Sequence, residues 1–236
     1  MPDSTHTESP ATEPLSTDLP REGSPYHVSD VMTHTVIAVG REASFKELVE
    51  LIQQWRVSSL PVLEGEGRVI GVVSEADLLP KEEFRDADPT RYDVLRRLSD
   101  MAKAGAVTAG ELMTSPAVSV RADATLAVAA RIMARRRVKH LPVVDATGLL
   151  QGVVSRSDLL KVFLRPDEDI AAEIRRAVLA SLPPEPQVEV HVQEGVVTLG
   201  GILRDTALVP VLARASRAVE GVVDVRLDLN QGASEQ

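Results

Sequence analysis

The chain repeats itself once, and this duplication constrains its fold more than any other feature of the sequence. Met32 recurs as Met113 and Asp77 as Asp158, each 81 residues later, within the matching strings Met-Thr, Leu-Pro-Val and Gly-Val-Val-Ser-x-x-Asp-Leu-Leu. One offset that holds across three strings indicates an internal repeat. Two similar units in one chain tend to pack about a pseudo-twofold axis, and we expect a ligand site in the cleft between them.

The composition excludes several classes of protein. The chain has 236 residues, a net charge of −9 and no cysteine. Structural disulfides and thiolate metal sites are therefore excluded, and a cytoplasmic location fits best. The acidic balance argues against nucleic-acid binding, which needs a basic surface. The sequence has neither an N-terminal apolar run typical of a signal peptide nor an apolar stretch long enough for a transmembrane helix.

Shifts in composition divide the chain into segments. Residues 1–25 hold five acidic residues and one basic residue among many Ser, Thr and Pro, which predicts a disordered tail. A polar linker between the repeats predicts one helix beyond Pro89, carrying Tyr92, Leu95 and Leu98. The predicted segments are a tail at 1–25, repeats at 26–80 and 109–165 separated by a linker at 81–108, a third domain at 167–230 and a disordered tail at 231–236.

Each repeat predicts a helix followed by two strands joined by a turn. Ser44 and Thr125 are the candidate N-caps of the two helices, and Glu47 completes a capping box in the first. The spacing predicts apolar faces formed by Phe45, Leu48, Val49 and Ile52 in one helix and by Leu126, Ala129, Ala130 and Met133 in the other. We expect such faces to contact a second copy of the chain and form a homodimer.

The C-terminal segment predicts a separate small sandwich in the order helix, strand, strand, helix, strand. Val188, Val190 and Val192 alternate with polar residues, which is typical of a strand with one buried face. Gly200-Gly201 is expected to end the second strand, and Gly221 to cap a helix over 205–220.

These motifs resemble two known families. The Asp/Glu-x-Met-Thr, Leu-Pro-Val and Gly-Val-Val-Ser-x-x-Asp-Leu-Leu strings resemble a tandem pair of CBS domains, and the C-terminal Glu194-Gly195-Val-Val-Thr-Leu-Gly-Gly string resembles a BON domain. The resemblance implies an α/β (α+β) fold. It also implies a regulatory protein without catalytic activity that binds an adenosyl ligand, such as AMP, ADP, ATP or S-adenosylmethionine. No obligatory cofactor is implied.

In the CBS domains that these repeats resemble, the carboxylate of the Ser-x-x-Asp string accepts hydrogen bonds from the ribose hydroxyls of the ligand. The matching residues are Asp77 with Ser74, and Asp158 with Ser155 and Ser157. The same string is also a helix-start signature, with Ser as the cap and Asp favoured by the helix dipole. The two roles are compatible, because a helix N-terminus suits a polar ligand.

Basic residues just before Leu-Pro contact phosphate in proteins that this pair resembles. Here they are Lys139 and His140, whereas the first repeat has Ser58 and Ser59. We therefore expect two unequal clefts, with phosphate favoured beside Lys139. Cations at the end of a helix also complement its dipole, and this role explains the preceding Arg135 and Arg136.

The sequence contains no catalytic motif and no metal-ligand spacing, so no catalytic or metal-binding residue is predicted. Two alternatives to the sensor remain open. The CBS pair could be a dimerisation platform without a ligand, or the BON domain could bind phospholipid. Arg214 and Arg217 lie three apart on one predicted helix, but a solvated helix face explains them better than a lipid-binding patch does. We expect the BON domain to bind a protein partner rather than a membrane.

Overall fold

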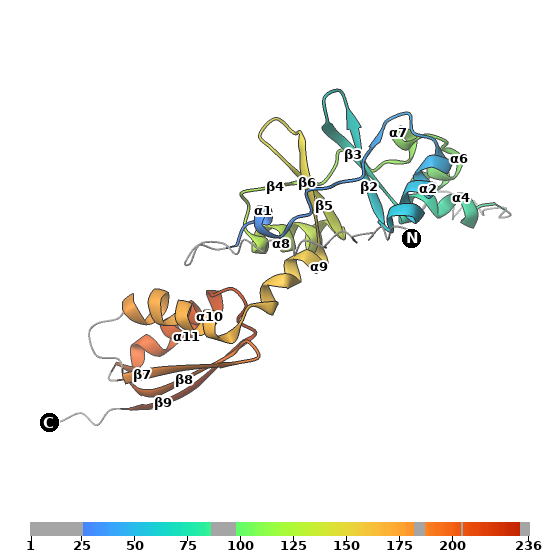
Figure 1. Cartoon of the computed structure of the whole chain (residues 1–236). Helices are drawn as coiled ribbons and strands as arrows, with labels where there is room; N and C mark the ends of the chain where they lie inside the picture. The colour runs from blue at the N-terminus through green and yellow to red at the C-terminus, as the bar shows by residue number, and fades with distance from the viewer. Residues whose placement is uncertain (1–25, 86–97, 182–186, 204, 232–236) are drawn as a thin grey trace, which may run out of the picture.

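The computed structural model describes residues 26–85, 98–181, 187–203 and 205–231 (Figure 1). The predicted tail at 1–25, most of the tail at 231–236, and Tyr92 and Leu95 of the linker helix lie outside these residues. Helices and three separate three-stranded sheets make up the described part of the chain. This mixed architecture confirms the predicted α+β class.

The first repeat is built around a sheet in the order β1-β2-β3, with β1 parallel and β3 antiparallel to β2. Ser44 begins its main helix as predicted, because its hydroxyl accepts the N–H of Glu47 and the Glu47 carboxylate accepts the N–H of Ser44. The elements are α1 (Val28–Val31), β1 (Val39–Gly40), α2 (Phe45–Trp55), β2 (Ser59–Glu64), β3 (Arg68–Ser74), α3 (Glu75–Leu78) and α4 (Pro80–Glu83).

The second repeat has the same topology, with the sheet order β4-β5-β6. Thr125 caps its main helix by accepting the N–H of Val128. Its elements are α7 (Ala109–Leu112), β4 (Val120–Arg121), α8 (Leu126–Arg136), β5 (His140–Val144), β6 (Leu150–Ser155), α9 (Arg156–Leu160) and the 3-10 turn η1 (Lys161–Leu164). Helix α6 (Leu98–Gly105) lies between the repeats in sequence.

The two repeats exchange their first helices. Val28 and Val31 of α1 belong to the buried core of the second repeat, with Leu141 and Val143. Ala109 and Leu112 of α7 belong to the core of the first repeat, with Leu60 and Val62. Each core is therefore completed by a helix from the other repeat, so the two repeats form one folding unit.

The two recurring motifs of the sequence meet across this exchange. Thr33 of the first Met-Thr string and Val153 of β6 exchange two backbone hydrogen bonds of 2.9 and 3.0 Å. A Cβ atom on Gly152 would lie 2.8 Å from the carbonyl oxygen of Thr33 and 2.9 Å from Sδ of Met32. The glycine is needed because the Met-Thr segment of the other repeat lies directly on it.

The C-terminal domain is a sheet in the order β7-β8-β9 with helices on one face (Figure 1). Its core contains Ile170, Ile174, Val197, Leu199 and Leu212 among others, and the predicted order of elements is confirmed. The elements are α10 (Asp167–Glu173), the π turn η2 (Ile174–Val178), η3 (Leu179–Ser181), β7 (Gln187–Gln193), β8 (Val196–Leu203), η4 (Thr206–Leu208), α11 (Val209–Ala218) and β9 (Asp224–Gln231).

Two local predictions for this domain were wrong. Gly200 and Gly201 do not end β8, because β8 is the central strand and Gly200 pairs with Glu189 on one side and Asp228 on the other. The second helix ends at Ala218 with Val219 as its C-cap, not at Gly221. Gly221 instead has a left-handed φ of 90°, and a Cβ there would lie 3.1 Å from the carbonyl oxygen of Val162.

Candidate functional site

Two cavities lie between the repeats, and each takes residues from both. The larger has a volume of about 580 Å³ and contains Asp158, whereas the smaller, of about 230 Å³, contains Asp77. Because the 81-residue offset relates their linings, Asp158, Ser155 and Thr33 of the larger cavity correspond to Asp77, Ser74 and Thr114 of the smaller one. The structure therefore divides the predicted site residues between two clefts.

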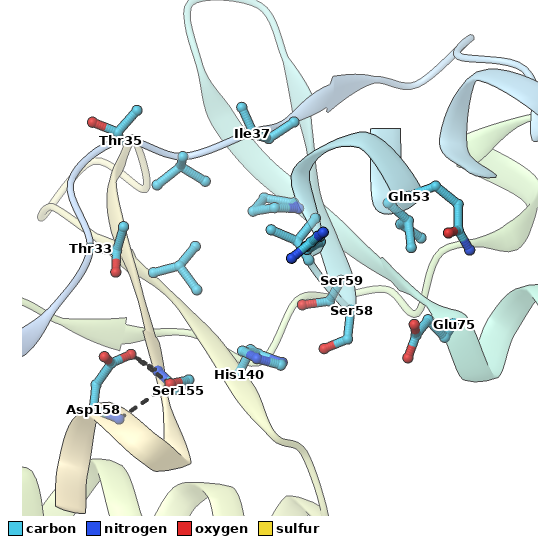
Figure 2. A pocket seen from close by; sticks show the side chains of 16 residues that line it. Thr33, Thr35, Ile37, Gln53, Ser58, Ser59, Glu75, His140, Ser155 and Asp158 are labelled. Carbon is cyan, nitrogen blue, oxygen red and sulfur yellow. Dashed lines mark hydrogen bonds between the residues drawn. The ribbon is translucent and has the colours of Figure 1, made fainter. Parts of the chain in front are cut away.

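The larger cleft combines an apolar wall with several polar groups. Figure 2 shows Asp158 and Ser155 at the start of α9, with His140 between them and Ser58. The cleft is lined by Thr33, Thr35, Val36, Ile37, Ile52, Gln53, Arg56, Val57, Ser58, Ser59, Pro61, Glu75, His140, Val153, Ser155 and Asp158. A cavity of this size and mixed lining suits a small organic ligand.

Asp158 both caps α9 and lies on the cleft. Its Oδ2 accepts the backbone N–H of Ser155 at 2.8 Å and the Ser155 hydroxyl at 2.6 Å, and the same hydroxyl accepts the N–H of Asp158 at 3.2 Å. Its Oδ1 contacts Nζ of Lys161 at 2.8 Å, and the Lys161 side chain is 56% exposed. The cap therefore uses one carboxylate oxygen and leaves the other for an exposed cation or a ligand.

The environment keeps Asp158 ionised and His140 neutral near pH 7. Burial favours a raised pKa for Asp158, but the hydrogen bonds from Lys161 and Ser155 outweigh burial and lower the pKa overall. Burial lowers the pKa of His140, and the charges of Lys139 and Arg156 add to the effect while Asp158 opposes it. The cleft therefore presents a carboxylate acceptor beside a neutral imidazole.

Asp77 has the same cap but different surroundings. Its Oδ2 accepts the Ser74 N–H at 2.7 Å and the Ser74 hydroxyl at 2.6 Å. Its Oδ1 accepts the Thr114 hydroxyl at 3.3 Å and is paired with the ammonium of Lys103 on α6. Both carboxylate oxygens of Asp77 are therefore occupied by protein groups.

The remaining predicted residues are distributed unevenly. Lys139 lines the smaller cleft with Asp77 and not the larger cleft with Asp158, whereas His140 lines both. Ser157 lines neither of these two cavities, and its hydroxyl lies 2.8 Å from that of Ser155. Ser58 and Ser59 are the uncharged counterparts of Lys139 and His140, and they line both clefts. In the cleft that contains Asp158, the residues just before Leu-Pro therefore include these two serines but not Lys139.

Sequence reasoning missed an arginine in each cleft. Arg56 lines the larger cleft and Arg137 the smaller one. The two residues are 81 apart, each follows the last residue of a helix, and each has a left-handed φ, of 52° and 56°. The same offset that revealed the repeat could have identified this recurring cation.

Family comparisons agree with this architecture. The CBS domain model matches residues 28–81 and 109–165, and the BON domain model matches residues 166–232. The chain therefore belongs to the CBS domain family and carries a C-terminal BON domain, which confirms the resemblance seen in the sequence.

Relatives of known sequence and structure share the CBS part. The chain is 30% identical to the chloroplastic CBS domain-containing protein CBSX2 of Arabidopsis thaliana over 171 residues, which cover 66% of this chain and 71% of that protein. It resembles the crystal structure of CBSX2 in complex with AMP with a TM-score of 0.52 and 30% identity, covering 59% of this chain and 97% of that one. Inosine-5'-monophosphate dehydrogenase of Bifidobacterium longum is 28% identical over 131 residues, which are 21% of that enzyme.

The described residues show two further features that bear on function. They contain no group of three or more His, Asp or Glu side chains arranged to hold a metal ion. None of the helices in the same residues has the length and apolarity to cross a bilayer.

Proposed function

We propose that this chain is a regulatory protein without catalytic activity, which binds an adenosyl nucleotide in the cleft that contains Asp158. The observation that carries the proposal is an ionised carboxylate at a helix start, facing a cavity of about 580 Å³ with apolar walls. The similarity to CBSX2, whose structure contains AMP, supports this choice of ligand class. S-adenosylmethionine, ADP and ATP belong to the same class.

The lining of the cleft matches the three parts of a nucleotide. Ile37, Ile52 and Val57 offer an apolar surface for a base. Oδ1 of Asp158 can accept a ribose hydroxyl when the exposed Lys161 moves aside, which costs little because exposed ion pairs contribute about 0–1 kcal/mol. Arg56 offers a cation for a phosphate.

Titration calorimetry of the full chain with AMP, ADP, ATP and S-adenosylmethionine tests the proposal. Because a hydrogen bond to a charged group contributes about 1.5–3 kcal/mol, we expect Asp158→Ala to weaken binding roughly ten- to a hundredfold. Asp228→Ala, which removes an exposed carboxylate of the BON domain, is the control and leaves binding unchanged. If no ligand of this panel binds the wild-type chain, the CBS pair is a dimerisation platform instead.

We also propose that the chain forms a homodimer through its CBS pair. The apolar helix faces that the sequence predicted as the dimer contact are mostly buried inside the repeats of the single chain. Their buried residues are Leu48, Ile52, Leu126, Ala129 and Met133. Leu79 and Leu160, related by the 81-residue offset, are instead 64% and 60% exposed in the isolated chain. Light scattering at tens of micromolar, repeated for Leu79→Lys/Leu160→Lys, tests this surface.

The role that we propose for the BON domain is binding of a protein partner rather than of anionic lipid. Residues 168–228 contain ten acidic residues and six arginines, so an anionic bilayer repels the domain overall. With the nucleotide site, this role makes the chain a cytoplasmic sensor in our proposal. Salt-sensitive pelleting of the full chain with phosphatidylserine vesicles is the result that would favour the lipid alternative.

A further inference from the structure

Asp77, which lines the smaller cleft, is already paired with a cation from within the chain. Lys103 extends from α6, and its ammonium pairs with Oδ1 of Asp77 and donates to the Thr114 hydroxyl at 3.3 Å. The side chains of Lys103 and Asp77 are only 19% and 12% exposed. Asp77 corresponds to Asp158 in the other cleft. Its Oδ1 is therefore covered by the largely buried ammonium of Lys103.

The two clefts differ most at this point. The cation on Asp158 is Lys161, which directly follows α9, three residues after Asp158, and is 56% exposed. Lys103 instead comes from a separate helix, 26 residues from Asp77 in sequence, and its side chain has about a third of the exposure of Lys161. Lys161 can leave Asp158 and move into solvent. Separation of Lys103 from Asp77 would instead leave the Lys103 ammonium without its ion-pair partner in a semi-buried site, which is unfavourable.

Helix α6 is itself fastened to the first repeat. Nζ of Lys81 on the neighbouring α4 donates to the carbonyl oxygen of Ala104 at 3.1 Å. Ala106, which directly follows α6, is 5% exposed and belongs to the core of the first repeat. Because α6 is held at Ala104 and Ala106, directly after Lys103, withdrawal of the Lys103 side chain would require its own rotation rather than release of a loose segment.

We propose that Lys103 closes the Asp77 cleft to ribosyl ligands, so that the intact chain has one nucleotide site rather than two. The linker helix thus determines which of two related clefts accepts the ligand. This inference rests on the proposed function for the identity of the ligand, AMP. The closure of the Asp77 cleft by Lys103 is tested separately from AMP binding in the Asp158 cleft.

The test is the number of AMP sites per full-length chain, measured by calorimetry for wild type and Lys103→Met. Methionine keeps the aliphatic stem and removes the charge. We expect one site in the wild type and two in the variant, the added site being lost again in Lys103→Met/Asp77→Ala. Lys161→Met, which removes the exposed cation beside Asp158, is the matched control and leaves one site.

Each outcome separates the two proposals. No site in the wild type and one Asp77-dependent site in Lys103→Met would support the closure by Lys103 and reject the Asp158 site. Two sites in the wild type, or an unchanged number in a folded Lys103→Met, would overturn the closure. Folding is checked by circular dichroism, and Lys103→Ala replaces the methionine variant if that variant does not fold.

Discussion

Single residues in unusual backbone conformations mark both clefts. Arg56 and Arg137 adopt left-handed φ values that favour glycine, yet both positions carry arginine. A non-glycine residue in this region costs about 1–2 kcal/mol. Because both side chains line a cavity, we infer that the cost is retained for the guanidinium that each position supplies.

This interpretation predicts that Arg56→Gly raises the stability of the CBS pair but lowers its affinity for AMP. Relief of the left-handed backbone should stabilise the CBS pair by about 0.5–1 kcal/mol. Loss of the cation should weaken AMP binding about tenfold or more, while adenosine binding changes little. Arg137→Gly makes the same backbone change in the other cleft and should leave AMP affinity unaltered. Denaturation followed by Trp55 fluorescence and calorimetry measure the two effects, and equal losses for AMP and adenosine would contradict the assignment.

His140 predicts a pH dependence of binding. Burial lowers its pKa, so it is neutral in the free protein near pH 7, with Lys139 and Arg156 opposing its protonation and Asp158 and Glu75 favouring it. A bound phosphate would favour the protonated form, so affinity should rise as the pH falls toward the lowered pKa of His140. A partly exposed ion pair contributes about 0.2–1 kcal/mol, which limits the gain to about fivefold.

The measurement compares AMP affinity of wild type and His140→Gln between pH 7.5 and 5.5. The ratio of the two affinities isolates the imidazole, since titration of the AMP phosphate is common to both proteins. A ratio that stays constant with pH would show that His140 does not meet the phosphate.

Among the secondary-structure elements, those set by neighbouring residues were the most predictable. The caps at Ser44 and Thr125 and the alternating strands of the BON domain follow from residues within a few positions. The exchange of α1 and α7 between repeats was not predictable, because their apolar residues fit either core equally well by pattern. The edge pairings of Thr33 with Val153 and of Thr114 with Val72 hold α1 and α7 against the core of the other repeat.

The exchange predicts that Gly152→Ala is disruptive. The added methyl group would lie 2.8 Å from the carbonyl oxygen of Thr33, so the edge pairing must shift. Overpacking of this kind costs about 1–3 kcal/mol. Gly40→Ala, where a Cβ has no neighbour within 4 Å, is the control and should be nearly neutral. Urea denaturation followed by Trp55 fluorescence gives both values, and an equally stable Gly152→Ala would show that the edge pairing is not tight.

On the scale of the whole molecule, the CBS pair and the BON domain meet at a small polar junction. The backbone N–H of Tyr26 donates to the carboxylate of Glu220 at 2.6 Å, and Arg165 donates to the carbonyl oxygen of Glu220 at 2.7 Å. Arg165 also pairs with Glu173 at 2.8 Å. These contacts join the N-terminal end of α1 and the end of the second repeat to the BON domain.

The junction predicts a defined effect of pH on stability. Burial raises the pKa of Glu220, although the Tyr26 N–H and Arg165 oppose the shift. A raised pKa means that the folded state binds the proton more tightly, so this contribution to stability is present at low pH and is lost as the pH rises through the folded-state pKa. Glu220→Gln should therefore raise the Tm at pH 7, and the difference should vanish near pH 4. Calorimetric melting across this range measures it, and a difference that grows at low pH would contradict the sign.

The sequence by itself determined the repeat, the helix and two strands at the centre of each repeat, the order of elements in the BON domain, and the carboxylates that begin α3 and α9. These follow from local signals, because caps, turns and apolar periodicity act within a few residues. The tertiary structure alone decided that Lys139 lines the cleft with Asp77, that Arg56 lines the cleft with Asp158, and that Lys103 pairs with Asp77. These residues are distant in sequence, and they meet because the exchanged helices and paired strand edges bring the two repeats together.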